Sequence, residues 1–593
     1  EVGGETLMKR THNATELDIH LVGREVMLNG WVDTRRDHGG LIFVDLRDRS
    51  GIIQLVFSPE VKEEAFHLAE QIRSEYVIAV RGKLSLRPEA TENPNLKTGK
   101  VEVYVEDIEV LSPAKTPPFY IENDIDVDEN LRLKYRYLDL RRPEMRDNLL
   151  LRHRVVKCMR DFLDSRGFIE IETPILTKST PEGARDYLVP SRVHPGEFYA
   201  LPQSPQIFKQ ILMVAGMEKY FQIARCFRDE DLRADRQPEF TQLDMEMSFV
   251  DEEDIIVLVE EMMAEIFFKA AGKVIRTPFP RLAYDDAMIN YGSDKPDLRF
   301  GLEIVELSEM LQNTQFKVFA SALQSGGVVR ALNAKGCGSF TRREIDALGA
   351  MAVENGAKGM AWILVQENEL RSPITKFLSE EEIEQILMTT GAEAGDLILF
   401  GADQAEIVAR VMGILRLELG RKKGLIAEEE LNFVWVTDFP LLEYDEEEKR
   451  YQAKHHPFTS PRLEDIEIMD SEPGRVKARA YDLVLNGTEL GGGSIRIHRR
   501  EWQEKMFSVL GMSQEEARDK FGFMLEAFEY GTPPHGGIAF GVDRLLMLLA
   551  GRNSVRDVMA FPKTQSASCP MTEAPSTVSA RQLRELALRI REK

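Results

Sequence analysis

Phe227-Arg228-Asp229-Glu230, followed closely by Arg236-Gln237-Pro238-Glu239-Phe240, is the most informative segment of this chain. Its pattern predicts an arginine on a strand, then a charged turn, then a returning strand over residues 240–246. A second segment far downstream, Gly536-Gly537-Ile538-Ala539-Phe540-Gly541-Val542-Asp543-Arg544, predicts another arginine at the start of a helix, just after a glycine-rich turn. Because two fixed guanidinium groups can grip a triphosphate in forked geometry, the two segments together predict a polyphosphate-binding site.

Arg228 on its own has a plainer interpretation. An isolated Phe-Arg-Asp-Glu is usually a surface arginine in a salt bridge. The context favours a ligand-binding role, because Arg233, Arg236 and Gln237 follow in a loop rich in hydrogen-bond donors and Arg544 supplies the same chemistry elsewhere.

Size and composition predict a globular protein of several domains. At 593 residues the chain is too long for one core, so three or four domains are expected. Its hydrophobic content of 43% and charged content of 30% are typical of soluble proteins. No apolar run is long enough to span a bilayer, and the first five residues lack the basic and apolar regions of a signal peptide.

The cysteines bear on the redox compartment of the protein, and the net charge bears on its class of partner. Four cysteines without a Cys-x-x-Cys pair suggest neither a zinc site nor a disulfide framework, so a reducing cytoplasm is expected. A net charge of −23 argues at first against a nucleic-acid partner. Binding depends on local potential rather than on the sum over the chain, however, so composition leaves this point open.

The hydrophobic pattern divides the chain into six parts. Residues 24–111 read as five short strands with one helical interruption at about 59–74, which suits a small OB-type barrel. Helical periodicity begins at Asn148 and ends near Gly167, a strand follows at 168–171, and an apolar helix is expected over about 252–271. A helix is also expected in the tail from about 578. The expected boundaries are 1–112, 113–147, 148–294, 295–425, 426–564 and 565–593, with the fourth part an insertion and the second a linker.

Asp482 and Glu489 bracket a tight Asn-Gly turn and can converge as oxygen ligands. Mg²⁺ prefers one or two carboxylates together with substrate phosphates. The alternative is a solvated hairpin tip. The run Gly491-Gly492-Gly493 favours the ligand site, because glycines let a backbone approach a ligand closely.

Other segments leave two interpretations open. Residues 181–187 form either a mobile lid or an ordinary surface loop. Lys209, inside an apolar helix start, is by itself more typical of a side chain that reaches out to solvent. The pair His455-His456 favours neither a metal site nor a catalytic base, since adjacent residues on a strand point apart. Phe43 is either barrel core or, given the neighbouring Arg35-Arg36, a ring on which single-stranded bases stack.

Together with Pro174 in the preceding helix–strand unit, the two arginine segments resemble the three signature motifs of class II aminoacyl-tRNA synthetases. Three further segments are similar to the aspartate branch: Gln203-Ser204-Pro205-Gln206, His455-His456-Pro457-Phe458 and Gly487-Thr488-Glu489-Leu490-Gly491-Gly492-Gly493-Ser494-Ile495-Arg496. The insertion at 295–425 resembles that of the bacterial type. The resemblance covers about residues 8–580. It implies an α+β fold, in which an antiparallel sheet flanked by helices follows an all-β OB barrel and is interrupted by an α/β insertion domain.

The resemblance also implies an activity. The expected enzyme is an aspartate–tRNA ligase that uses ATP and Mg²⁺ to form aspartyl-adenylate, then transfers the aspartyl group to tRNA. The helix–strand unit around Pro174 is a dimer interface in the family, so a homodimer is expected, with no membrane partner. The amino-acid carboxylate attacks the α-phosphorus itself, so the protein supplies positioning and charge stabilisation.

Site residues follow by matching the family's motifs. ATP contacts are expected from Arg228, Asp229, Glu230, Gln237, Phe240, Glu489, Gly541, Val542, Asp543 and Arg544. Aspartate contacts are expected from Glu182, Ser204, Gln206, Lys209, Arg228, Asp244, His455 and Arg496, with His456 a further candidate. Arg228, Arg544 and Glu182 are the catalytic candidates, and Asp482 and Glu489 the ligands for Mg²⁺. A neutral amide in place of the substrate carboxylate would leave the guanidinium of Arg496 unpaired, which is costly.

The barrel is expected to read the anticodon through Arg36, Phe43, Gln54 and Glu102. His38-Gly39-Gly40 resembles members that also charge tRNA(Asn), whereas Ala90 stands where such members often have glycine. The choice between tRNA(Asp) alone and both tRNAs therefore stays open. An asparagine- or lysine-activating relative is disfavoured by Arg496 and Lys209, which suit a side-chain carboxylate. A catalytically silent RNA-binding paralogue is disfavoured because the motif arginines and both metal carboxylates are present.

Overall fold

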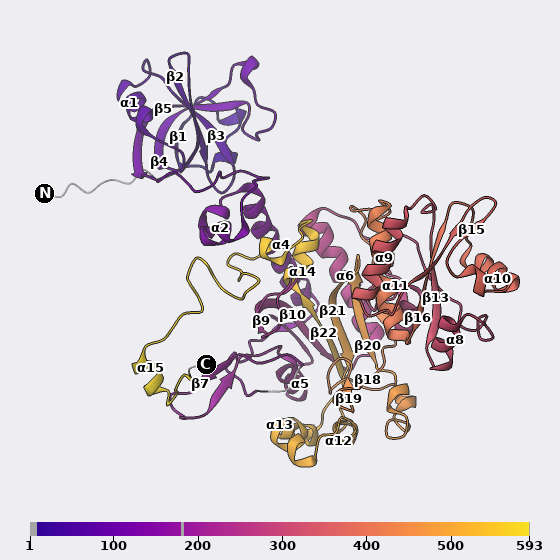
Figure 1. The fold of residues 1–593 in the computed structure, drawn as a ribbon. Coiled ribbons are helices and arrows are strands. Elements are labelled where there is room, and N and C mark those ends of the chain that lie inside the picture. The colour runs from indigo at the N-terminus through magenta and orange to yellow at the C-terminus, as the bar shows by residue number, and fades with distance from the viewer. Residues whose placement is uncertain (1–8, 180–182, 592–593) are drawn as a thin grey trace. The chain divides into compact units, whose positions relative to one another are not determined.

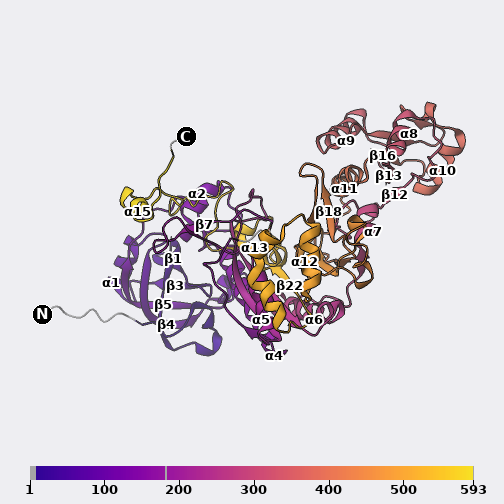
Figure 2. The ribbon, with the colours of Figure 1, turned by 90° about the horizontal axis from the view of Figure 1, so that it is seen from below.

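The computed structural model describes residues 9–179 and 183–591, and Figures 1 and 2 show the ribbon from two directions. The chain divides into two compact units. The first contains the residues up to 150 together with 560–564 and 568–576, and the second contains the remainder. No described helix is both long and apolar enough to span a bilayer.

A closed five-stranded barrel begins the first unit, as expected for an OB fold. Its strands are β1 (Glu25–His38), β2 (Leu41–Arg47), β3 (Ile52–Phe57), β4 (Val77–Leu86) and β5 (Val101–Ser112). They pair in the order β1-β2-β3-β5-β4, and α1 (Glu63–Gln71) interrupts them between β3 and β4. Alternation sets the two faces of β2, because Ile42, Val44 and Leu46 are buried in the barrel core while Phe43 is on the opposite face and half-buried. The alternative that Phe43 is barrel core is therefore wrong.

Three helices follow the barrel. Two are short, α2 (Glu129–Lys134) and α3 (Arg136–Asp139), and the long α4 (Pro143–Ser165) carries the chain into the second unit. The helix expected from Asn148 starts five residues earlier, at a proline whose fixed φ suits the first helical position. Gly167, expected at the end of this helix, has a φ of +80°, a conformation that glycine adopts readily.

An eight-stranded sheet forms the centre of the second unit, in the order β11-β17-β20-β21-β22-β10-β9-β6. Its strands are β6 (Ile169–Glu170), β9 (Lys219–Phe227), β10 (Glu239–Ser248), β11 (Arg281–Ala283), β17 (Phe433–Thr437), β20 (Ala480–Leu485), β21 (Thr488–Ile495) and β22 (His535–Gly541). All neighbours are antiparallel except β11–β17 and β6–β9. The strand expected at 168–171 is only two residues long, and β9 ends at Phe227, so Arg228 lies one residue beyond the strand.

One face of this sheet is covered by three helices: α4, α6 (Glu252–Ala271) and α14 (Val542–Leu549). Apolar side chains such as Phe162 of α4, Met263 of α6 and Leu546 of α14 pack there against Leu243 of β10 and Leu483 of β20. Odd-numbered residues of β10 enter this core, so Gln242, Asp244 and Glu246 project from the other face. The functional site is on that second face.

Other strands and helices of the second unit lie outside both the large sheet and the insertion. They are β7 (Leu188–Pro190), β8 (Phe198–Ala200), α5 (Gln206–Val214), α7 (Tyr284–Asn290), β18 (Leu442–Asp445), β19 (Arg450–Ala453), α12 (Arg500–Val509), α13 (Gln514–Ala527) and α15 (Ala580–Glu585). α5 and α13 pack together through a small aromatic core that includes Phe458 and Phe521. The helix expected in the tail from about 578 is only the six residues of α15.

The insertion is a separate five-stranded antiparallel sheet that interrupts the large one between β11 and β17. Its strands are β12 (Ile304–Glu306), β13 (Val328–Ala334), β14 (Ala361–Val365), β15 (Leu370–Arg371) and β16 (Leu397–Asp403), in the order β12-β13-β16-β14-β15. α9 (Arg342–Glu354) and α11 (Ala405–Lys422) pack on one face, and α8 (Lys317–Gln324) and α10 (Glu380–Thr390) on the other. The insertion mixes helices and strands as expected, but its sheet is antiparallel, unlike the parallel sheet typical of an α/β domain.

Candidate active site

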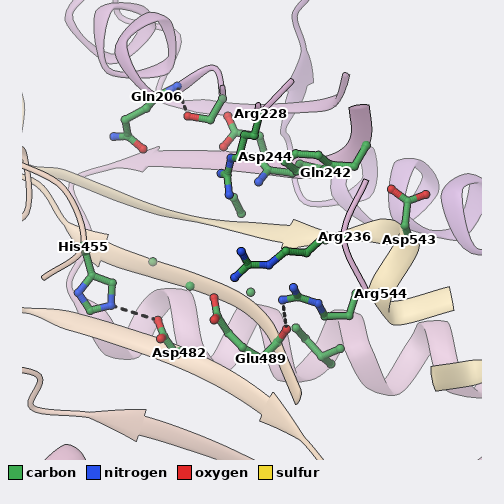
Figure 3. A pocket seen from close by; sticks show the side chains of 18 of the residues that line it. Gln206, Arg228, Arg236, Gln242, Asp244, His455, Asp482, Glu489, Asp543 and Arg544 are labelled. Carbon is green, nitrogen blue, oxygen red and sulfur yellow. Dashed lines mark hydrogen bonds and ion pairs between the residues drawn. The ribbon is translucent and has the colours of Figure 1, made fainter. Parts of the chain in front are cut away.

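A cavity of about 400 Å³ opens on the uncovered face of the large sheet. It is floored by β10, β20, β21 and β22 and bordered by α5 and α14, and Figure 3 shows its side chains. Fifteen of the expected substrate residues line it: Ser204, Gln206, Lys209, Arg228, Glu230, Gln237, Phe240, Asp244, His455, Asp482, Glu489, Arg496, Gly541, Asp543 and Arg544.

Three expected residues are placed differently. Glu182 lies outside the described residues. Val542 is fully buried in the core beneath α14, and Asp229 is part-buried and bridges Arg185 through the backbone rather than lining the cavity. Asp543 does line it, but one carboxylate oxygen accepts from Arg152 Nη1 at 2.5 Å and the other from the Thr241 amide at 2.7 Å. Asp543 therefore ties α14 to its neighbours.

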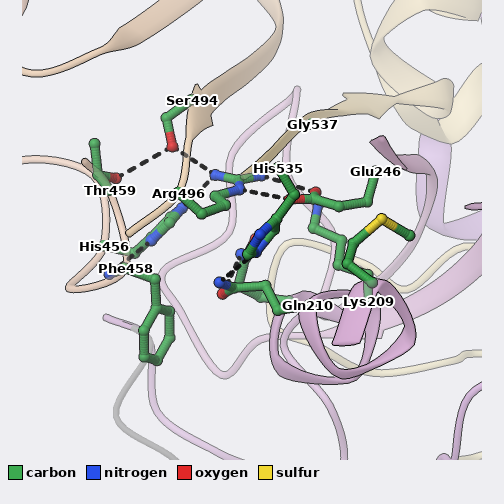
Figure 4. Close-up of polar contacts among 12 residues, drawn as sticks. Lys209, Gln210, Glu246, His456, Phe458, Thr459, Ser494, Arg496, His535 and Gly537 are labelled. Atoms are coloured by element: carbon green, nitrogen blue, oxygen red, sulfur yellow. Dashed lines mark hydrogen bonds and ion pairs between the residues drawn. The ribbon is translucent and has the colours of Figure 1, made fainter. Parts of the chain in front are cut away.

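One end of the cavity holds a buried network of two cations and two carboxylates, of which Figure 4 shows Arg496, Lys209 and Glu246 and Figure 3 shows Asp244. Arg496 donates from Nε to Glu246 at 3.0 Å and from Nη2 to the other oxygen of Glu246 at 3.3 Å. Lys209 Nζ lies 2.6 Å from Asp244 Oδ1 and 3.3 Å from Glu246 Oε2. All four side chains are at most 2% exposed, so Lys209 does not reach out to solvent.

Glu246 needs a glycine opposite it. A Cβ on Gly537 of β22 would lie 2.0 Å from Glu246 Oε2 and 2.1 Å from the Met245 carbonyl oxygen. The glycine thus makes room for the carboxylate that holds both cations. Burial raises the pKa of Glu246, but the neighbouring Arg496 and Lys209 outweigh it and hold that pKa below its usual value. Glu246 is therefore charged at neutral pH.

The network leaves specific donors and acceptors for a ligand. Four of the five N–H groups of Arg496 are engaged, because Nη1 also donates to Ser494 Oγ and to His456 Nε2, both at 2.7 Å. Among the described residues, nothing pairs with the last N–H on Nη2, and Lys209 retains a third N–H. Asp244 Oδ2 is buried and accepts no hydrogen bond from any described residue. The cavity thus offers two N–H donors on two cations, and one carboxylate oxygen as an acceptor.

The two histidines of the His-His pair lie in the loop after β19 rather than on the expected strand, and their side chains contact different groups. His456 accepts from Arg496, and burial together with Arg496 lowers its pKa well below the usual value, so it is neutral. His455 Nε2 lies 3.5 Å from Asp482 Oδ1 (Figure 3). Burial lowers the pKa of His455, but the charge of Asp482 outweighs this and raises it overall.

The opposite end of the cavity carries arginines. Arg544 donates from Nη1 to the Glu489 carbonyl oxygen at 2.9 Å, and its Nη2 lies 3.3 Å from Asp235 Oδ2. Arg228 places its guanidinium 5.1 Å from the ring centre of Phe240, and Arg236 pairs with Glu230 at 3.3 Å. These arginines belong to the loop between β9 and β10 and to α14, and Phe240 is on β10; they come from the two segments that predicted a polyphosphate site.

Asp482 and Glu489 lie between the two ends, on neighbouring strands β20 and β21. A Cβ on Gly492 would lie 2.5 Å from Asp482 Oδ1 and 3.6 Å from Glu489 Oε1, so both carboxylates converge above this glycine. Burial and the neighbouring Asp482 raise the pKa of Glu489. Asp482 Oδ1 is buried and accepts no hydrogen bond from the described residues, although His455 Nε2 lies 3.5 Å from it. Two close carboxylates with an unsatisfied oxygen fit a hard divalent cation that takes its other ligands from a substrate.

The barrel brings three of the four expected anticodon residues into one chain of contacts. Arg36 Nη2 lies 3.3 Å from Gln54 Oε1, and Gln54 Nε2 donates to Glu102 at 2.8 Å. Phe43 is directly opposite Arg36 in the β1–β2 pairing. His38, at the end of β1, and Ala90, in the turn after β4, are exposed.

Sequence reasoning missed three residues of the catalytic cavity region. The only indication of Glu246 in the sequence is that it lies two residues after Asp244 and therefore on the same face of the strand. His535, which is fully buried and 3.1 Å from Gln210 Nε2, had no signal beyond the adjacent glycines. Asp235, in the charged loop, gave no sign of its contact with Arg544.

Comparison with known proteins agrees with this arrangement. Residues 128–565 match the family model for "tRNA synthetases class II (D, K and N)", and residues 26–111 match the "OB-fold nucleic acid binding domain". A protein of Heliobacterium modesticaldum called "Aspartate--tRNA(Asp/Asn) ligase" is 62% identical over 99% of this chain and 97% of its own length. One of Bacillus subtilis with the same name is 59% identical over 98% and 99%.

Solved structures share the fold at low sequence identity. Asparaginyl-tRNA synthetase from Pyrococcus horikoshii complexed with asparaginyl-adenylate superposes with a TM-score of 0.60 at 20% identity, over 94% of this chain and 99% of that one. A putative aspartyl-tRNA synthetase from Leishmania major gives 0.60 at 20% identity, over 95% of both. The chain therefore belongs to the class II tRNA synthetases of the D, K and N group, with an OB-fold nucleic-acid-binding domain ahead of the synthetase domain.

Proposed function

We propose that this protein is an aspartate–tRNA ligase that charges both tRNA(Asp) and tRNA(Asn). It first joins L-aspartate to ATP as aspartyl-adenylate, with release of pyrophosphate, and then transfers the aspartyl group to the 3′ end of the tRNA. Full-length relatives at about 60% identity carry the name aspartate–tRNA(Asp/Asn) ligase, which supports this assignment.

The observation that carries the proposal is the set of unpaired donors at the buried end of the cavity. The remaining N–H groups of Lys209 and Arg496 suit the two oxygens of a side-chain carboxylate. Asparagine would turn an amide NH₂ toward one of these donors and leave a buried cation without its partner, which is costly. The free Oδ2 of Asp244 suits the α-ammonium group of the same substrate.

ATP is assigned to the arginine end. Arg228 would bind the α-phosphate and the aspartate α-carboxylate, and Arg544 the γ-phosphate. Phe240 would stack on adenine and Glu230 would contact its amino group, with Gln237 and Gly541 as further ATP contacts. Bringing the α-carboxylate oxygen up to the α-phosphorus forms one O–P bond as the bond to pyrophosphate breaks. The chain supplies orientation and positive charge in this step.

Mg²⁺ is assigned to Asp482 and Glu489, because these converging carboxylates need a cation and one oxygen lacks a hydrogen bond. The ion would neutralise charge on the ATP phosphates. Ser204, Gln206 and His455 are assigned to the rim of the aspartate pocket, and Glu182 is a third catalytic candidate.

The barrel is assigned to the anticodon, with Phe43 as the stacking ring and Arg36, Gln54 and Glu102 as hydrogen-bonding partners. An exposed His38 followed by two glycines is consistent with reading both tRNAs; a strict tRNA(Asp) enzyme is the alternative. We further propose a homodimer through the helix–strand unit before Pro174, and a cytoplasmic setting.

Pyrophosphate exchange tests the amino-acid assignment. The purified protein should exchange pyrophosphate into ATP when aspartate is present, and far less when asparagine or lysine replaces it. Equal exchange with asparagine would contradict the donor argument. An absence of exchange with every amino acid would instead favour a silent RNA-binding relative.

A further inference from the structure

The contacts of the Arg544 guanidinium determine which of its edges is available to a ligand. Its Nη1 is held by the Glu489 carbonyl oxygen at 2.9 Å, a backbone contact that orients the guanidinium plane. The opposite edge, formed by Nε and Nη2, is the two-pronged edge that pairs with a phosphate or a carboxylate. Among the described residues, Nε has no hydrogen-bond partner although it is buried.

Asp235 occupies half of that edge. Its Oδ2 lies 3.3 Å from Arg544 Nη2, and both residues line the cavity. The contact is backed by the main chain, because the Ala234 carbonyl oxygen accepts from the Val555 amide at 3.0 Å. The loop between β9 and β10 is thereby fastened just beyond α14, with the Asp235 carboxylate next to Arg544.

We propose that Asp235 stands in for the terminal phosphate of ATP, so that this carboxylate occupies the Arg544 edge until ATP displaces it. This inference rests on the assignment of Arg544 to the γ-phosphate in the proposed function. Asp235 is a positioning residue here, and it sets ATP affinity in two ways. Its ion pair with Arg544 must be broken when ATP binds, and its negative charge repels the incoming polyphosphate.

The exposure of the pair sets the size of the effect. The Arg544 side chain is 26% exposed and that of Asp235 is 40% exposed, so solvent weakens their attraction. Removing the charge of Asp235 should tighten ATP binding about two- to five-fold, the range that corresponds to a part-exposed ion pair. AMP lacks the γ-phosphate that would pair with Arg544. The affinity for AMP should therefore not change.

The loop offers a matched control. Asp231 is exposed in the same loop and forms no ion pair with another described residue. Asp231→Asn removes the same charge a few residues away, whereas Asp235→Glu keeps the charge and the ability to reach Arg544. Thermal unfolding of each variant checks that the fold is intact.

Calorimetric titration of the full chain with ATP and with AMP, in buffer containing Mg²⁺, tests the proposal. Asp235→Asn should lower the Kd for ATP two- to five-fold with an unchanged Kd for AMP, while Asp231→Asn and Asp235→Glu stay close to the original protein. An unchanged or higher Kd for ATP in Asp235→Asn would overturn it, as would an equal fall in Asp231→Asn or for AMP. These titrations measure nucleotide binding at equilibrium. Their outcome therefore does not depend on whether the protein activates aspartate.

Discussion

Replacing Arg496 with leucine tests the aspartate pocket most sharply. The guanidinium has one N–H left for the substrate carboxylate, and a hydrogen bond between charged groups contributes about 1.5–3 kcal/mol. We therefore expect kcat/KM for aspartate in pyrophosphate exchange to fall by about 10- to 150-fold. ATP affinity should be nearly unchanged, because Arg496 is at the opposite end of the cavity from Arg544.

The same change affects stability, and this effect can be separated. Arg496→Leu leaves Glu246 buried with Lys209 as its remaining cation, and breaking a buried ion pair costs about 3–5 kcal/mol. The double variant Arg496→Leu/Glu246→Gln removes the uncompensated charge, so it should recover much of the lost stability without recovering activity. Undiminished aspartate-dependent exchange in either variant would refute the role given to Arg496.

Three further outcomes are expected. Phe43→Ala should weaken tRNA charging about ten-fold, as expected for one lost base stack, but spare pyrophosphate exchange; loss of both would show that the ring matters for folding. Burial lowers the pKa of His535 from 6.5 to about 4, so the unfolded chain binds its proton first as the pH falls. The free energy of unfolding of the second unit should therefore fall by about 3 kcal/mol as the pH is lowered from 6.5 to 4. Urea titrations of the His535→Gln variant should show a smaller fall. Gly537→Ala should lower the urea midpoint, because its Cβ would lie 2.0 Å from Glu246 Oε2; an unchanged midpoint would contradict the close packing there.

The barrel could be predicted from the pattern of its short strands, whereas the large antiparallel sheet and the α/β character of the insertion followed from the resemblance to the family. The helix α4 begins earlier than its apolar face, since Pro143 starts it without contributing to that face. The two-residue strand β6 is shorter than expected because only Ile169 and Glu170 pair with β9. Such ends depend on pairing partners rather than on local pattern.

The site was predictable where the chemistry is local and not where it depends on register. Asp482 and Glu489 flank one turn, so their convergence follows from the hairpin. Glu246 and Arg496 are 250 residues apart, and Asp235 and Arg544 are 309 apart. Each contact requires the order β21-β22-β10 and its register, which no single segment reveals.

Aspartate charging of two purified transcripts, tRNA(Asp) and tRNA(Asn), side by side tests the central claim most directly. The account predicts that the full-length protein attaches aspartate to both, with ATP consumed in each case. Charging of tRNA(Asp) alone would show a strict enzyme and remove the argument from His38. Charging of neither, under conditions where the fold is intact, would contradict the assignment as an aspartate–tRNA ligase.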